Sequence, residues 1–347
     1  MGKRRKPSPP SRARLAVLTT AAAGTAVLAS STTAYAAPKP DLATVKKQVD
    51  ALYEEAEASI ERFNGADERA KKLQAEANQL QTQLAEGQEK LNAVQGQLGA
   101  LAAAQYRNGG VDPSLQLMLS SDPDTYLRQA SARDQEADTQ LALLRQAQRQ
   151  QQRLDQQRAE TAATLAALDA NHKALAEEKG KVQTKLAEAK KILNSLTAAE
   201  RAQVDVDEAG RASRGAAERT DLTGLPQVPA DGRAAAVLKF AQAQLGKPYI
   251  WGAEGPAGFD CSGLTLRAWE QAGVRLPRVS QDQWNAGTRI PRANLQPGDL
   301  VFFYSDLHHV GIYIGNNKMI HAPRTGKNVT VLDLQYMPDY MGAVRPG

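Results

Sequence analysis

Apolar residues in the first part of the chain recur at alternating spacings of four and three, the pattern of a coiled-coil seam. One series comprises Leu73, Ala77, Leu80, Leu84, Gly87, Leu91, Val94, Leu98 and Leu101. A second comprises Leu165, Leu168, His172, Leu175, Lys179, Val182, Leu186, Ala189, Leu193 and Leu196. The two series predict two long helices, with His172 as a polar residue on the seam of the second.

The segment between the two series contains residues that end and restart helices. Asn108-Gly109-Gly110 breaks the first helix, because paired glycines abolish helix preference. Asp112-Pro113 and Asp122-Pro123 fit helix starts with proline at the first position. We therefore expect an antiparallel helical hairpin whose first arm has about 65 residues. The second arm should be longer and fray by residues 210–215.

A short apolar helix is expected at the bend of the hairpin. It contains Leu115, Leu117, Met118 and Leu119. These side chains either pack onto their own hairpin or form a partner-binding tip, since a turn has few neighbours to cover an apolar surface.

The N-terminus has the features of a secretory signal peptide over residues 1–36. Six lysines and arginines precede an uncharged apolar run at residues 15–29, and Ala34-Tyr35-Ala36 forms a small-x-small cleavage site. A membrane anchor is the alternative, but the run is shorter than the ~20 residues that a span needs. The pattern favours export and cleavage.

Removing this segment changes the charge of the protein. The whole chain has a formal net charge of +5, and its first 14 residues carry six positive charges and no acid. The rest is therefore nearly neutral, and the overall basicity does not indicate a nucleic-acid partner. Within it, residues 37–231 are net acidic and residues 232–347 are net basic.

The composition changes again after the helical region at residues 37–222. Residues 223–231 form a linker with two prolines, and residues 232–347 form a separate domain. Apolar spacing predicts a helix at residues 234–245. Three runs of β-branched and aromatic residues predict strands at 300–303, 309–314 and 318–321.

Cys261 is the only cysteine, so it cannot form an internal disulfide. Asp260 fits an N-cap, which places Cys261 in the first turn of a helix. Unpaired N–H groups and a partial positive charge there favour the reactive thiolate and can bind an oxyanion. The sequence thus favours a nucleophile over a buried, inert cysteine.

A cysteine nucleophile needs a base, and three histidines lie in the same domain. Strand alternation places His308 with the aliphatic face of residues 310–314, and places His309 with Gly311 on the other face. His309 is therefore favoured as base over His308, with Gly311 leaving room for a helix end or substrate. His321 is the remaining histidine to orient that base, its alternative being a structural histidine. Adjacent strand residues cannot face one ion, so neither a metal nor another cofactor is expected.

Four motifs in this domain strongly resemble the NlpC/P60 family of cell-wall peptidases. In order they are GKPYIWGAEGPAGFDCSGL, LPRVSQDQW, PGDLVFFYSDLHHVGIYIG and MIHAP. The resemblance implies an α+β papain-like fold following the long antiparallel helical hairpin. It also implies hydrolysis of peptidoglycan stem peptides, commonly at the D-γ-glutamyl to diaminopimelate bond. Cys261 matches the nucleophile, His309 the base and His321 the third polar member of the triad.

The same resemblance implies further site residues. Tyr249 matches a tyrosine near the developing oxyanion, and Asp260, Ser262 and Ser280 match positions around the S2-side pocket. Val279 stands where some members carry an acid that binds a free stem-peptide amine, which favours action on stems attached to the wall.

The coiled coil resembles that of Gram-positive wall hydrolases involved in cell separation. We therefore expect a secreted, wall-associated enzyme whose coil restrains it until a membrane protein of the division complex engages the apolar bend. The second arm and the linker are expected to allow the coil to fold back onto the site. Two alternatives remain: an amidase-type cysteine hydrolase that cuts between muramic acid and L-Ala, and an inactive wall-associated scaffold.

Overall fold

A computed structural model describes residues 41–107, 122–201, 203–204 and 232–347. The expected signal peptide, the linker at 223–231 and the apolar bend at 115–119 lie outside the described residues. Within the described ranges, no helix combines the length and the apolar character needed to cross a membrane.

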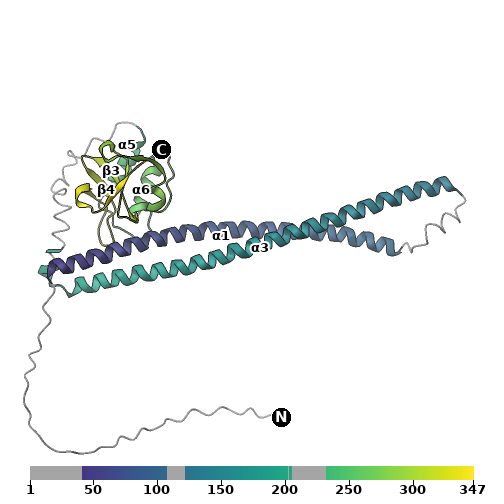
Figure 1. Ribbon diagram of the computed structural model, residues 1–347, viewed down its shortest axis with the longest axis horizontal. Coiled ribbons are helices and arrows are strands. Elements are labelled where there is room, and N and C mark those ends of the chain that lie inside the picture. The colour runs from purple at the N-terminus through teal and green to yellow at the C-terminus, as the bar shows by residue number, and fades with distance from the viewer. Residues whose placement is uncertain (1–40, 108–121, 202, 205–231) are drawn as a thin grey trace, which may run out of the picture. The chain divides into compact units, whose positions relative to one another are not determined.

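Two long helices dominate the N-terminal region, α1 (Leu42–Arg107) and α3 (Pro123–Ser195) (Figure 1). They contact each other in antiparallel order. Lys185 near the end of α3 pairs with Glu55 near the start of α1, and Arg158 bonds to Gln88 further along α1. The expected hairpin of two long antiparallel arms is confirmed, with 66 residues in the first arm and 73 in the second.

The apolar seam is confirmed for α1 and only partly for α3. Every member of the first series is buried or half-buried. In the second series His172, Leu165 and Lys179 are exposed, so placing them on the seam was wrong. Their neighbours Thr164, Asn171 and Glu178 face inward instead, where Asn171 donates a 2.5 Å hydrogen bond to the Ala66 carbonyl. Polar contacts between the helices thus replace apolar packing at alternate positions.

The helix ends follow the local capping chemistry. α1 ends at Arg107, immediately before the predicted break, and the Asp122 carboxylate caps α3 by accepting a hydrogen bond from the Asp124 N–H. α3 ends at Ser195, earlier than expected. Thr197 and Glu200 then form a reciprocal capping box that starts a new turn.

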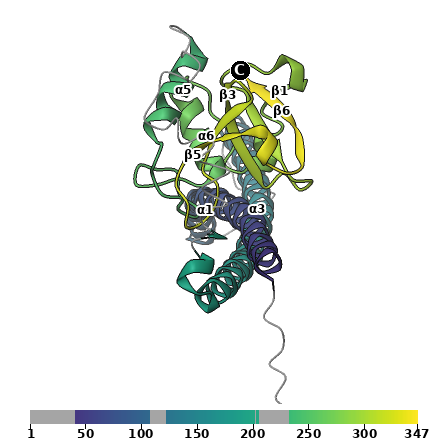
Figure 2. The ribbon, with the colours of Figure 1, turned by 90° about the vertical axis from the view of Figure 1, so that its left-hand side faces the viewer.

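The C-terminal domain contains one antiparallel sheet with strand order β1-β6-β2-β3-β4-β5 (Figure 2). The strands are β1 (Gly287–Ile290), β2 (Leu300–Phe303), β3 (His309–Gly315), β4 (Lys318–His321), β5 (Thr330–Asp333) and β6 (Tyr340–Pro346). The helices are α5 (Arg233–Ala243), α6 (Cys261–Glu270) and α7 (Ser280–Gln283), with 3-10 turns η2 (Arg292–Asn294) and η3 (Leu334–Tyr336). The expected helix and the three expected strands are all present.

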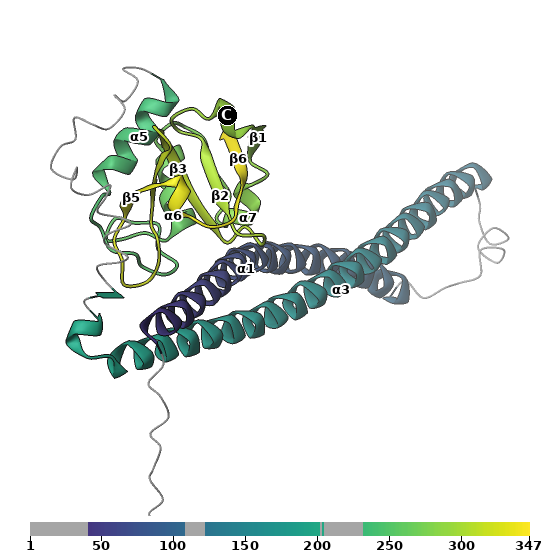
Figure 3. The ribbon, with the colours of Figure 1, turned by 60° about the vertical axis from the view of Figure 1, so that its left-hand side comes forward.

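The two faces of β3 separate two apolar clusters. Val310, Ile312 and Ile314 belong to the cluster that includes α5 and α6, and α6 contacts β3 directly (Figure 3). Tyr313 belongs to the opposite cluster with Phe303. The predicted alternation along this strand is confirmed, and it places the cysteine helix against the core side of the histidine strand.

Gly311 has a different role from the one expected. A Cβ at this position would lie 2.6 Å from Sδ of Met319 and 3.3 Å from Cβ of His321. Residues of the neighbouring strand β4 therefore fill the space beside Gly311, where room for a helix end or substrate was expected. A glycine fits here because a side chain would require Met319 to move.

Candidate active site

The cysteine helix begins at the residues that the sequence singles out. Asp260 has an extended backbone and accepts a 2.7 Å hydrogen bond from the Gly263 N–H, which makes it the N-cap of α6. Cys261 is the first residue of the helix and is buried. The predicted placement of Cys261 in the first helical turn is therefore confirmed.

The two histidines proposed to act together are in contact. Nε2 of His309 on β3 lies 2.9 Å from Nδ1 of His321 at the end of β4. Burial lowers the pKa of His321 well below its usual value, and the nearby His309 adds to this effect. A neutral His321 can accept the Nε2 proton of His309 at its Nδ1, which leaves Nδ1 of His309 as the proton acceptor of the pair.

His308 has other partners. Its Nδ1 pairs with the Asp306 carboxylate, and its ring stacks on Tyr304 with centroids 4.1 Å apart. The Asp299 carboxylate bonds to Arg345 and to the Gln296 N–H, as fits the turn residue that the sequence predicts. Throughout the described part of the chain, no three histidine, cysteine, aspartate or glutamate side chains group as metal ligands.

Tyr249 and the pocket residues lie in the same region as the cysteine. Tyr249 is buried, and its hydroxyl has no hydrogen-bond partner among the described residues. Burial raises the pKa of Tyr249 well above its usual value, and nearby carboxylates raise it further, so the hydroxyl keeps its proton as a donor. Asp260, Ser262 and Ser280 are fully buried.

Arg278 is a site residue that sequence reasoning missed. Its guanidinium bonds to both Asp260 oxygens, at 3.1 and 2.5 Å, to Ser262 Oγ at 2.8 Å and to Glu254 at 3.0 Å. Burial alone would lower the pKa of Arg278, but the Asp260 carboxylate outweighs it and raises that pKa. Arg278 therefore fixes the geometry of Asp260 and Ser262. Its place in the LPRVSQDQW motif, two residues before Ser280, was the available signal.

The least expected feature of the site is a carboxylate from the helical hairpin. Glu61 of α1 is buried, and its Oε1 lies 3.5 Å from the Cys261 Sγ. Oε1 accepts a 2.7 Å hydrogen bond from Ser262 Oγ. Oε2 accepts bonds from the backbone N–H and the hydroxyl of Ser280, at 2.9 and 3.2 Å. Three of the predicted site residues thus surround this one carboxylate.

Neighbouring residues of α1 contact the rest of the site. Glu57 Oε2 lies 3.5 Å from Nδ1 of His309, and Asn64 donates a 3.0 Å hydrogen bond to Asp260. Among the described residues no hydrogen bond joins Cys261 to His309. The bonds of Sγ go to Glu61 and, at 3.7 Å, to the His308 carbonyl. α1 therefore contacts both the predicted nucleophile, Cys261, and Nδ1 of the predicted base, His309.

This arrangement reverses the expected ionisation of the cysteine. Burial raises the pKa of the Cys261 thiol well above its usual value, and Glu61, Asp260 and Glu57 raise it further. The helix N-terminus was expected to favour the thiolate. Loss of solvent and three nearby carboxylates outweigh that effect, so the cysteine is protonated while α1 lies against it.

Comparisons with known proteins place this domain in a recognised group. Residues 246–345 match the model of the NlpC/P60 family. A probable endopeptidase of Mycobacterium tuberculosis is 45% identical over 116 residues, which are 33% of this chain and 30% of the relative. A probable endopeptidase of Corynebacterium glutamicum is 43% identical over 125 residues, 36% of this chain and 59% of the relative. The match therefore spans less than two thirds of either relative.

The solved structures that are similar to this chain include two NlpC/P60 proteins. The NlpC/P60 family protein from Bacillus cereus is 37% identical over 34% of this chain and 41% of its own, with a TM-score of 0.32. The NlpC/p60 domain of the peptidoglycan hydrolase SagA is 38% identical over 32% of this chain and 97% of its own, with a TM-score of 0.30. The helical hairpin lies outside the residues matched by the family model.

Proposed function

We propose that this chain, whose residues 246–345 form an NlpC/P60 domain, is a secreted cysteine endopeptidase that cleaves peptidoglycan stem peptides. The bond we assign is that between D-γ-glutamate and diaminopimelate. The exported enzyme would act in the cell wall, and the helical hairpin would control access to its active site.

The carboxylate-binding pocket beside the nucleophile is the observation that carries this proposal. Ser262 Oγ and the N–H and Oγ of Ser280 bind both oxygens of one carboxylate, 3.5 Å from Sγ. A glutamate linked through its γ-carbonyl leaves its α-carboxylate free close to the scissile bond. The pocket that holds Glu61 is therefore suited to the free carboxylate of a γ-linked glutamyl residue.

The residues support a thiol acyl-transfer mechanism. Once α1 leaves, Nδ1 of His309 can take the proton of Cys261, and the thiolate attacks the γ-carbonyl carbon of the substrate. The Tyr249 hydroxyl and the N-terminal N–H groups of α6 would stabilise the oxyanion. Protonated His309 then returns its proton to the leaving amine. Water hydrolyses the thioester with His309 as base, while the contact with His321 holds the ring in place.

The hairpin acts in this proposal as a built-in inhibitor. Glu61 fills the carboxylate pocket, and Glu57 lies against the base. Apolar and aromatic contacts support the closed state, since Ile60 belongs to the domain core and Phe63 packs edge-on against Trp251, with ring centroids 5.0 Å apart. From the sequence, the second arm is expected to allow the coil to fold back. The first arm instead supplies the blocking residues, while Val182 and Leu186 of α3 join the same core cluster.

In this proposal, release of α1 requires an interaction from outside the chain. Because α1 is covalently connected to the domain, the blocking contact has a high effective concentration and does not need to be strong. A membrane protein of the division complex that engages the hairpin is the partner we propose, through the apolar bend at residues 115–119.

A digest of soluble disaccharide-peptide muropeptides tests the proposed chemistry. The full mature chain carrying Glu57→Ala and Glu61→Ala should convert them into disaccharide-dipeptides, identified by mass spectrometry. Adding Cys261→Ala should remove all turnover, because loss of a nucleophile costs several orders of magnitude. Release of intact stem peptides, which leaves peptide-free glycan with its lactyl groups, would show an amidase instead. Turnover that persists in the Cys261→Ala chain would overturn the assignment of the nucleophile.

A further inference from the structure

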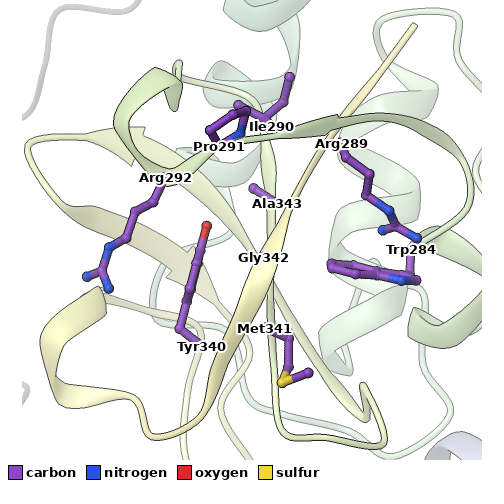
Figure 4. Close-up of a pocket in the computed structure, with 9 residues that line it drawn as sticks. All are labelled: Trp284, Arg289, Ile290, Pro291, Arg292, Tyr340, Met341, Gly342 and Ala343. Carbon is purple, nitrogen blue, oxygen red and sulfur yellow. The ribbon is translucent and has the colours of Figure 1, made fainter.

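A concave site that does not include Cys261 or the histidines lies at the edge of the sheet. The cavity has a volume of about 470 Å³ and is bordered by α7, β1, η2 and β6 (Figure 4). Its lining residues are Trp284, Arg289, Ile290, Pro291, Arg292, Tyr340, Met341, Gly342 and Ala343. None of them takes part in the mechanism proposed above.

Two arginines flank this cavity, and each is held against an aromatic ring. The Arg289 guanidinium lies 3.3 Å from the centroid of the Trp284 ring, and that of Arg292 lies 5.0 Å from the centroid of Tyr340. Arg289 also donates a 3.1 Å hydrogen bond to the Asn285 side chain. Stacking fixes the plane of a guanidinium while leaving its in-plane donors available to an oxyanion.

Neither positive charge is neutralised within the described residues. No carboxylate lies within ion-pair distance of Arg289 or Arg292 there, whereas Arg267, Arg278 and Arg345 of the same domain each pair with one. Both residues are exposed. Two ordered but unpaired guanidinium groups at one cavity form a site that is complementary to negative charge.

The strand between the arginines gives the site its shape. Figure 4 shows Arg289 with Trp284 on one side of β6, and Arg292 with Tyr340 on the other. Gly342 lies on the strand between them, and a Cβ there would come within 2.8 Å of the Trp284 ring. The missing side chain lets Trp284 lie close to β6. A ligand that contacts both arginines must cross this strand and carry at least two oxyanions.

We propose that the Arg289–Arg292 cavity binds an anionic polymer of the cell wall and anchors the protein there independently of its active site. Phosphodiester and carboxylate groups share the required chemistry, because either accepts paired hydrogen bonds from a guanidinium. Among the residues that the structure describes, the hydrogen bonds and ion pairs between α1 and the domain involve none of the lining residues. The cavity is therefore accessible in the closed state, so an inhibited enzyme can already be held at the wall. The location of the protein in the cell wall rests on the proposed function.

Binding of the full mature chain to purified sacculi tests this site. Cys261→Ala is included in every protein so that no cleavage occurs. Arg289→Ala with Arg292→Ala should lower the affinity for sacculi about tenfold, and added salt should weaken wild-type binding. The matched control is Lys239→Ala with Arg275→Ala, which removes two other exposed positive charges from the same domain. Near-UV circular dichroism checks that both variants are folded.

The comparison of the two double variants decides the proposal. Retained binding by the control and loss by the Arg289 and Arg292 variant would support it, and equal binding by the two would overturn it. Sacculi stripped of phosphodiester-linked polymers with hydrofluoric acid identify the ligand. Arginine-dependent binding that survives stripping assigns peptidoglycan carboxylates, and binding that is lost assigns phosphate. Because no turnover is measured, this result stands apart from the peptidase assignment.

Discussion

Oε2 of Glu57 on α1 lies 3.5 Å from Nδ1 of His309 on β3. This is the ring nitrogen left free when Nε2 of the same histidine bonds to His321. The Glu57 carboxylate therefore lies against the ring nitrogen that the Cys261 thiol is expected to contact. One turn further along α1, Glu61 contacts the thiol itself. The hairpin thus contacts both the predicted nucleophile, Cys261, and the predicted base, His309.

The first prediction concerns the strength of this block. Glu61→Ala should raise kcat/KM of the mature chain on soluble muropeptides by about tenfold or more, because it removes the buried hydrogen bonds that Glu61 makes with Ser262 and Ser280. Glu76→Ala is the matched control, since Glu76 is exposed further along the same helix. Steady-state kinetics of the two variants provide the comparison. Equal rates for wild type, Glu61→Ala and the control would leave the hairpin as a spacer only.

The second prediction separates the two adjacent histidines. His309→Ala should lower kcat by about 10²- to 10⁴-fold, as expected when a general base is lost. His308→Ala should cost far less, because His308 pairs with Asp306 and stacks on Tyr304. Both changes are made in the Glu57→Ala, Glu61→Ala background so that the site is open. If His308→Ala proves the more damaging change, the base has been misassigned.

The catalytic domain could be predicted from sequence because its chemistry is encoded locally. Asp260 caps the helix that begins at Cys261, and alternation along residues 309–314 separates His309 from the aliphatic face. Each inference needed only a few neighbouring residues and one rule of backbone geometry. The structure agrees with both.

The contact between α1 and the site could not be predicted in the same way. Glu57 and Glu61 resemble the many other glutamates on the outer face of a coiled coil. Only the tertiary structure shows that the Ala56–Glu61 segment is covered on more than one side, with Glu57, Ser59 and Glu61 all buried. The seam error on α3 has a related cause. Asn171 faces inward because its amide donates a hydrogen bond to the Ala66 carbonyl on α1. The periodicity of a single helix cannot reveal such a partner.

The third prediction tests whether Arg278 positions the pocket. Arg278→Ala should lower the free energy of unfolding of the domain by about 3 kcal/mol or more, because it leaves Asp260 buried without its cation. Arg267→Ala should cost less than about 1 kcal/mol, because its pairs with Glu254 and Glu270 are partly exposed to solvent. All three tryptophans lie in this domain, so their fluorescence during denaturant unfolding reports on it alone. Similar losses for the two variants would contradict this role.

The fourth prediction is a pH dependence of inhibition. Burial raises the pKa of Glu61 in the closed state, and the Asp260 carboxylate adds to this, against the opposing effects of the Ser280 N–H and of Arg278. The pKa of the Cys261 thiol is raised in the same state, chiefly by burial and then by Glu61. When α1 is released, the Glu61 carboxyl should return toward about 4.3, the ordinary pKa of glutamate. The closed state therefore holds more protons than the open one.

Because closing takes up protons, the closed state should lose stability as the pH rises above the ordinary pKa of glutamate. Inhibition is measured by dividing kcat/KM of the Glu57→Ala, Glu61→Ala chain by kcat/KM of the wild type. Both proteins carry out the same chemistry, so its pH dependence cancels in this ratio. This ratio should be largest near pH 5 and fall toward about pH 8, where a glutamate in solution is fully ionised. A ratio that stays constant or rises over this range would show that Glu61 closes the site as a carboxylate, without proton uptake.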